Sequence, residues 1–322
     1  MAQDDSRAIA WLVMWVWPSH FGLPLLAAIC LLSGTVTRHP LFLNLIITEI
    51  LAGLSNSILL YTGHWRATGP QPSVNVCLFQ AGLGNGEASM TAAASFALAY
   101  QVFISVRGAI RGHRAHTNGA NVIGLLILPY ALFVIFAVST IVVGGHKLEF
   151  VVRNSFLPYC QYTGKTATTV AATFAGILTC GTLLMEAWII FYLYQQRRAL
   201  RKAGIKNLLM ADTSLRIIAF TGLMVMALLL ILIGFTTPMS AVPDLVMCTM
   251  GTFLVLVFGT QRDILHVILR RDRTQSPSEG STLKFNNTAS QALSSIYENT
   301  IIVQADEKRA RSPTGTGGSW EP

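Results

Sequence analysis

A long run that is nearly free of charge extends from Cys77 to Val106, and it constrains the fold more than any other stretch. As a helix this run is about 45 Å long, at 1.5 Å per residue. That exceeds the roughly 30 Å hydrocarbon core of a bilayer, so the helix can cross a membrane with tilt and project at both ends. A cysteine lies at one end, and Arg107, Arg111 and Arg114 lie beyond the other. We interpret the run as the central third helix of a membrane-embedded bundle, with the cysteine outside.

The composition also indicates an integral membrane protein. Hydrophobic residues make up 52% of the 322 residues and charged residues only 12%, which is about half the charged fraction of a soluble domain. The apolar residues gather in runs of about twenty, which predicts membrane spans. The net charge of +8 would fit nucleic-acid binding, but the Lys and Arg residues flank the apolar runs in alternation, which argues against it.

The apolar runs predict an all-α bundle of seven transmembrane helices. The expected spans are 15–36, 41–61, 77–106, 122–143, 168–194, 215–235 and 243–258. We expect an extracellular N-terminus over 1–11, a transmembrane domain over 12–260 and a short amphipathic helix over 261–273 in the inner membrane interface. The tail, 274–322, is rich in Ser, Thr, Gly and Pro, so we expect it to be disordered and open to kinases.

The basic residues near the span ends set the orientation. The loops around 107–114 and 197–206, together with residue 38 and the segment 262–273, hold more than twice as many Lys and Arg residues as the opposite set of loops. Because cytoplasmic loops carry the excess of positive charge, the N-terminus is expected outside and the tail inside.

Two of the five cysteines lie in or beside polar outer loops. These are Cys77 and Cys160, whereas the other three fall in apolar runs. On the oxidising outer side a disulfide between them would persist and would fix the outer loop over the bundle. The alternative is two unrelated thiols. The chain has no Cys-x-x-Cys pair, so cysteine-based metal binding is not supported.

Taken together, these features resemble a G-protein-coupled receptor over about residues 12–272. The stretch 44–49, Asn-Leu-Ile-Ile-Thr-Glu, resembles the span-two motif of rhodopsin-like receptors. The Cys-Leu-Phe-Gln-Ala opening of span three, 77–81, and the Phe-Gly-Thr-Gln-Arg-Asp exit from span seven, 258–263, resemble orphan fungal seven-helix receptors, which are distantly similar to fungal pheromone receptors. The chain lacks the Asp/Glu-Arg-Tyr, Cys-Trp-x-Pro and Asn-Pro-x-x-Tyr motifs of rhodopsin-like receptors, so their switch residues are not transferred.

The resemblance implies a plasma-membrane receptor without a cofactor or enzymatic activity. It would transmit an extracellular chemical signal, whose ligand the sequence does not identify, to a heterotrimeric G protein. Gly222 in span six is a candidate hinge.

Three carboxylates lie within the expected spans, where ionisable groups are costly and are candidates for function. Glu49 shares an arc of span two with Asn56, and Glu87 shares an arc of span three with Thr91. Rhodopsin-like receptors hold a sodium ion between these spans, so the resemblance implies that this intramembrane polar site binds sodium at Glu49 and Glu87, or holds a shared proton. The alternative is hydrogen bonding that only joins helices. Glu186 lies nearer the cytosol and could pair with Arg107 or Arg216.

Basic side chains are expected to gather on the cytosolic face, where spans three and five end. Their charge suits an acidic partner protein or anionic lipid headgroups. The residues are Arg107, Arg111, Arg197, Arg198, Arg201 and Lys202.

Three other classes of membrane protein fit the sequence less well than a receptor does. A small-solute or proton transporter would use the intramembrane Glu residues, but the chain shows no internal repeat or paired broken helices. A retinal protein needs a Lys for its Schiff base, and span seven contains none. An intramembrane hydrolase is not supported either, because we find no paired Asp, His-Glu-x-x-His or Ser/His set.

Overall fold

The computed structural model describes residues 2–32, 39–66, 69–110, 119–154, 157–202, 220–226, 229, 242–260 and 264. The chain divides into two compact units, one of 1–106 with 116–271 and the other of 107–115 with 272–322. The fold described below is that of the first unit. The amphipathic helix expected over 261–273, apart from Ile264, and the tail 274–322 lie outside the described residues.

The first helix is longer than predicted and contains a π-helical turn. It runs without a break through α1 (Ala2–Val16), the π-helix η1 (Trp17–Gly22) and α2 (Leu23–Leu32). It therefore begins well before residue 15, where the span was expected. Pro18 lies in η1; proline has no N–H and cannot make the usual bond to the preceding turn, which a π-helical turn accommodates. The Ser19 hydroxyl donates to the Trp15 carbonyl at 2.5 Å.

The second predicted span is divided in the structure into α3 (Pro40–Asn56) and the short α4 (Ile58–Tyr61). Pro40 occupies the first helical position, where its missing N–H costs nothing. The Leu41 N–H donates to His39 Nδ1 at 3.3 Å. Burial lowers the pKa of His39 below its ordinary value, which favours the neutral ring that this bond requires.

A glycine ends α4 and turns the chain into the outer loop. Gly63 has φ 78°, a left-handed conformation that glycine adopts at little cost. The His64 N–H bonds the Leu59 carbonyl at 2.8 Å and the Gly63 N–H bonds the Leu60 carbonyl at 3.1 Å. This is the bonding pattern with which helices commonly end at a glycine.

Three long helices follow. They are α5 (Val74–Ile110), α6 (Gly119–His146) and α7 (Lys165–Lys202). Four described helical segments are long and apolar enough to cross a membrane, namely Ala8–Leu32, Val74–Gly108, Gly119–His146 and Lys165–Gln195. Shorter apolar helices are α3 and α10 (Met250–Gly259), which follows α9 (Val242–Met247). The protein is thus mostly helical and fitted to a membrane.

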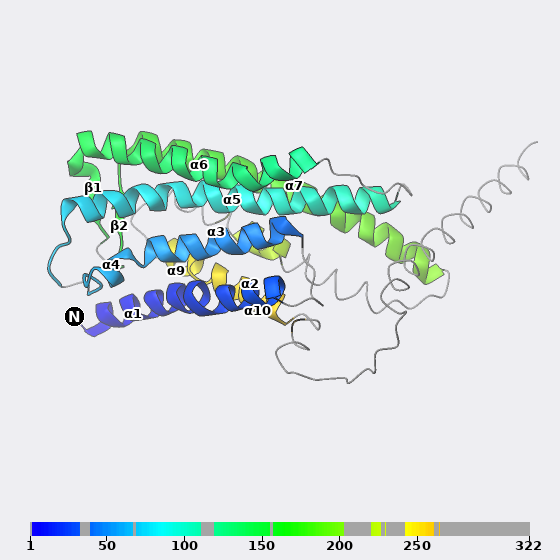
Figure 1. The fold of residues 1–322 in the computed structure, drawn as a ribbon, viewed down its shortest axis with the longest axis horizontal. Helices are drawn as coiled ribbons and strands as arrows, with labels where there is room; N and C mark the ends of the chain where they lie inside the picture. Colours follow the sequence, from blue (N-terminus) through cyan, green and yellow to red (C-terminus); the bar gives the residue numbers. More distant parts are fainter. Residues whose placement is uncertain are drawn as a thin grey trace, which may run out of the picture. The chain divides into compact units, whose positions relative to one another are not determined.

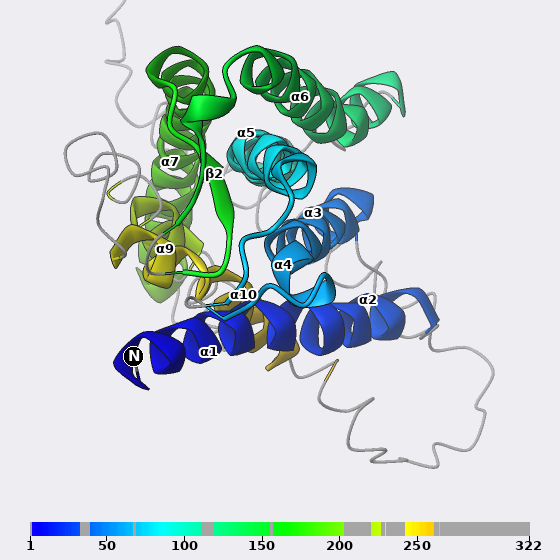
Figure 2. The same ribbon diagram turned by 90° about the vertical axis from the view of Figure 1, so that its left-hand side faces the viewer.

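The helix α5 lies between α3, α6 and α7 (Figure 2). Gln80 of α5 donates to the Ser55 carbonyl at the end of α3 at 3.3 Å, and the Ser89 hydroxyl donates to the Ala171 carbonyl of α7 at 3.4 Å. A Cβ placed on Gly86 would lie 2.6 Å from the Phe133 carbonyl oxygen of α6. Because that approach is possible only without a side chain, Gly86 serves helix packing.

Buried polar side chains join α3 and α5 to α6. The Tyr130 hydroxyl donates to Asn44 Oδ1 at 2.7 Å, and Asn85 Nδ2 donates to the Thr140 hydroxyl at 2.6 Å. Such bonds satisfy polar groups that lipid cannot satisfy, and so they fix how neighbouring helices are rotated against each other.

A β-hairpin that the sequence analysis did not anticipate lies between α6 and α7. A single 3₁₀ turn, η2 (Leu148–Phe150), leads into β1 (Val151–Arg153), which pairs antiparallel with β2 (Cys160–Tyr162) and places Val152 opposite Gln161. The hairpin lies at the same end of the helices as α4 (Figure 1).

Candidate functional site

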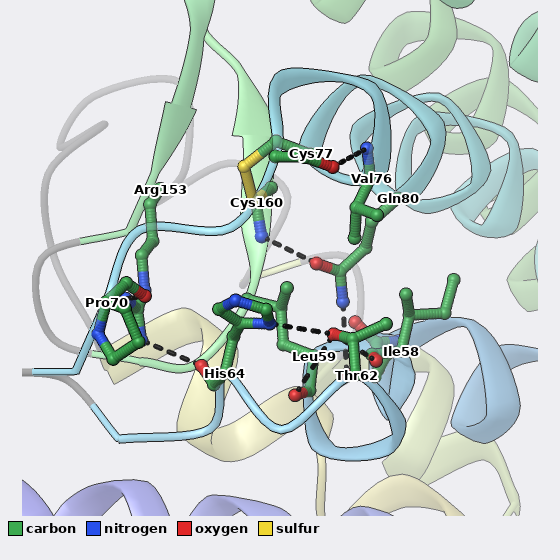
Figure 3. Close-up of a disulfide and its surroundings, with 12 residues drawn as sticks. Ile58, Leu59, Thr62, His64, Pro70, Val76, Cys77, Gln80, Arg153 and Cys160 are labelled. Atoms are coloured by element: carbon green, nitrogen blue, oxygen red, sulfur yellow. Dashed lines mark hydrogen bonds between the residues drawn. A yellow bond between two sulfur atoms is a disulfide. The ribbon is translucent and has the colours of Figure 1, made fainter.

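A disulfide attaches this hairpin to the head of α5. Cys77 lies in the first turn of α5 and Cys160 begins β2, and their Cα atoms are 5.1 Å apart (Figure 3). Both residues are buried. The predicted pairing of the two outer cysteines is therefore confirmed, and the hairpin is held to α5 by a covalent bond.

Gln80, one turn below Cys77, joins the hairpin to the end of α3. Its Oε1 accepts the Cys160 N–H at 2.9 Å, and its Nε2 donates to the carbonyls of Ser55 at 3.3 Å and Asn56 at 3.2 Å (Figure 3). These contacts define the orientation of the amide, since a flipped group would set donor against donor and acceptor against acceptor. Helical spacing places Gln80 one turn above Gly84 and two turns above Glu87 on the same side of α5, but spacing does not reveal these partners.

The structure brings three of the four predicted intramembrane residues together. Asn56 Nδ2 donates to Glu87 Oε2 at 2.7 Å and also to the Ala52 carbonyl at 3.0 Å. Glu49 lies close enough to Glu87 for the two carboxyls to interact electrostatically. The Thr91 hydroxyl instead donates to carbonyls of its own helix, at Glu87 and Ala88, a common choice for threonine in helices.

Ionising both of these close carboxyls has a high electrostatic cost, because the surrounding dielectric is low. A shared proton or a bound monovalent cation would remove that cost. Within the described residues no group of three or more His, Cys, Asp or Glu side chains could hold a metal ion. The sodium ion expected at Glu49 and Glu87 stays a prediction.

Glu186 occupies a different place in the bundle. It is 2% exposed, on the same buried stripe of α7 as Thr179 and Thr182, and its carboxyl faces Thr221 of the helical segment 220–226. The structure contains no ion pair to Glu186 within its described residues, and Arg216 lies outside them.

Arg153, to which the sequence analysis assigned no role, holds the loop between α4 and α5. From β1 its guanidinium donates to the carbonyls of His64 at 2.9 Å, Arg66 and Pro70 at 3.4 Å. Figure 3 shows the side chain extending toward this loop. Hydrogen bonds from a charged donor are stronger than neutral ones, so Arg153 fixes this loop against the hairpin.

Tyr159 connects the other side of the hairpin to α9 and α1. Its hydroxyl donates to Asp244 Oδ2 at 2.6 Å, and its ring stacks on Trp11 with centroids 5.5 Å apart. Burial and the neighbouring Asp244 raise the pKa of Tyr159 above its ordinary value, so the hydroxyl keeps its proton for this bond. The hairpin thus contacts α1 and α9 through Tyr159 and α5 through Cys160, and Gln80 of α5 connects it to α3.

The predicted cytosolic face is described only in part. Arg107 is exposed in the last turn of α5. Arg197, Arg198, Arg201 and Lys202 continue α7, but their side chains lie outside the description, as does Arg111 altogether. A Cβ added at Gly222 would meet nothing within 4 Å. Packing therefore does not require glycine there, and its role as a hinge stays a prediction.

No protein-family model matches the chain, and no curated protein matches it significantly.

Proposed function

We propose that the protein is a seven-helix receptor of the plasma membrane that transmits an extracellular chemical signal to a heterotrimeric G protein. The observation that carries the proposal is the Cys77–Cys160 disulfide, which holds an outer hairpin on the head of α5, the second of the four long apolar segments and the third span once α3 is counted. The proposal adds three spans to the four long apolar segments, with α3 as the second, the region around 220–226 as the sixth, and α9 with α10 as the seventh.

In such a receptor an outer stimulus favours one of two packings of the bundle. The hairpin is a suitable receiving element, since it contacts α1, α5 and α9 through Tyr159 and Cys160 and is connected to α3 through Gln80. The response would be a movement of the inner ends of spans three, five and six, with Gly222 as a hinge. The cytosolic partner face with Arg107 at the base of α5 would then engage the G protein.

The test is recruitment of a heterotrimeric G protein to the expressed receptor, stimulated by a panel of fungal culture extracts. A protein partner depends on particular side chains, whereas a lipid headgroup layer responds mainly to total charge. We therefore expect Arg107→Ala to abolish recruitment at unchanged surface expression, and the matched control Lys206→Ala to change it little. Equal effects of the two substitutions would assign the basic face to the membrane and would remove its proposed role as a partner site.

A second candidate function is transport of a small solute or proton. The paired carboxyls of Glu49 and Glu87 with Asn56 favour it, because intramembrane carboxyls commonly mark ion and proton pathways. Solute or proton flux in proteoliposomes that contain only this protein, without G-protein recruitment in cells, would support the transporter and refute the receptor.

A further inference from the structure

A chain of hydrogen bonds leads from the outer hairpin to the carboxyl of Glu87 through two side chains. The Cys160 N–H donates to Gln80, Gln80 donates to the Asn56 carbonyl, and the Asn56 side chain donates to Glu87, at 2.9, 3.2 and 2.7 Å respectively. Gln80 and Glu87 lie two turns apart on α5, so the chain covers about 10 Å along the helix. We call Gln80 and Asn56 the polar relay.

Gln80 has no spare N–H donor with which to adapt to a movement of the hairpin. Both hydrogens of its amide nitrogen and its oxygen are already bonded, and the residue is only 3% exposed. A buried amide that loses a partner keeps the full cost of its desolvation. A displaced hairpin must therefore either break this bond or move Gln80 and the end of α3 with it.

Asn56 lies where the backbone of α3 is already irregular. The Leu60 N–H bonds the Ser57 carbonyl, three residues back, instead of the Asn56 carbonyl, four residues back. That carbonyl is consequently available to Gln80, while the side chain of the same residue reaches Glu87. Within the described residues the charged group that faces Glu87 is Glu49, also on α3. Movement of this helix end would therefore change the surroundings of both carboxyls.

We propose that Gln80 and Asn56 are positioning residues that couple docking of the outer hairpin to the hydrogen bonding of the Glu87 carboxyl. Moving the hairpin changes the bond to Glu87, and changing Glu87 loosens the hairpin, because coupling between two sites is reciprocal. The coupling rests on the hydrogen bonds themselves and goes beyond the proposed function, since it would serve a receptor and a transporter alike.

The test is hydrogen exchange of the backbone amides of Cys160, Gln161 and Tyr162 in the purified full-length chain in lipid nanodiscs. Neither the Asn56 nor the Glu87 side chain has a hydrogen bond to the hairpin within the described residues. We nevertheless expect Asn56→Leu and Glu87→Leu to accelerate exchange of these amides at least fivefold, the lower end of ordinary allosteric couplings. Glu87→Gln should restore slow exchange, since its amide oxygen can still accept from Asn56.

The matched control is Asn85→Leu, on the same helix. It removes the 2.6 Å bond to Thr140, which is partly buried and joins two helices but does not belong to the relay. Equal acceleration in this control and in Glu87→Leu would show general loosening and would overturn the proposal. Unchanged exchange in Asn56→Leu, or a Glu87→Gln protein that behaves like Glu87→Leu, would also overturn it.

The proposal remains testable if Gln80→Leu does not fold. Asn56→Leu keeps the backbone carbonyl that accepts from Gln80, and so it interrupts the relay without removing the contact between the hairpin and α3. If Gln80→Leu does fold, we expect its hairpin amides to exchange fast. Adding Glu87→Leu to this variant should then accelerate their exchange less than twofold further. If Glu87→Leu accelerates exchange as much in the Gln80→Leu variant as in the wild type, the two residues act independently and the proposed coupling is refuted.

Discussion

Opening the Cys77–Cys160 disulfide should reduce the free energy of unfolding by an amount that can be estimated from the loop the disulfide closes. The two cysteines are 83 residues apart in sequence, and closing a flexible loop of that length contributes about 4.6 kcal/mol in the chain-entropy model. Membrane helices, however, stay inserted and helical when a bundle comes apart. Because α5 and α6 lie inside the loop, the freely flexible part is mainly the connection from Lys147 to Cys160. A loop of that length corresponds to about 3 kcal/mol, which is the loss that we expect.

The assay is thermal unfolding in detergent, with and without a reductant. A loss of about 3 kcal/mol corresponds to a decrease of the midpoint of roughly 6–12 °C. The double variant Cys77→Ser/Cys160→Ser should show the lowered midpoint without reductant and should not respond to it. Cys180→Ser is the matched control, because Cys180 is an exposed free thiol on α7, and it should behave like the wild type.

Two results would refute this reasoning. A loss near 4.6 kcal/mol would mean that α5 and α6 melt together with the hairpin. A reductant that lowers the midpoint of the double serine variant as much as that of the wild type would place the sensitivity at another cysteine.

Three further predictions concern the carboxyl site, the outer loop and the orientation. Glu49→Gln should abolish any dependence of thermal stability on sodium or pH, because it removes one of the two interacting charges; a wild-type protein insensitive to both would leave only a structural role. Arg153→Ala should reduce stability by about 1–3 kcal/mol and should speed trypsin cleavage after Arg66, since three carbonyl contacts are lost; Lys147→Ala, which removes another outer cation, is the control, and equal cleavage in the two variants would contradict the assigned role. An epitope placed after Trp320 should be stained only in permeabilised cells, and staining of intact cells would reverse the predicted orientation.

The long helices and the disulfide could be predicted because their signals lie in residue type and spacing. A long run that is nearly free of charge identifies α5 directly. Cys77 and Cys160 could be paired because both fall in or beside outer polar loops. The nearness of Asn56 to Glu87 followed from arcs of two neighbouring helices. Thr91 was placed on the right arc, but its hydroxyl bonds its own helix, a choice that helical spacing cannot reveal.

The hairpin and its contacts could not be predicted in this way. Its strands have three residues each, too few for an alternating pattern to stand out. The partners of Gln80 and Arg153 are backbone groups, which every residue type supplies, so no sequence signal identifies them. The interruption between α3 and α4 falls at Ser57, and not at a proline or glycine, the residues that usually mark such an interruption in a sequence.

The π-helical turn η1 gives the first helix one residue more than a regular α-helix of the same rise would hold. Each residue of an α-helix adds about 100° of rotation about the helix axis. The extra residue therefore determines which way the side chains of α1, which precede it, point. The turn itself packs against α3, as α2 does, and it follows the part of the helix that presents Trp11 to Tyr159. Deleting one residue from 17–22 would allow a regular helix, but it would rotate Trp11 and Trp15 away from the hairpin. The register of this helix, as well as its hydrophobicity, is therefore needed for the hairpin to dock.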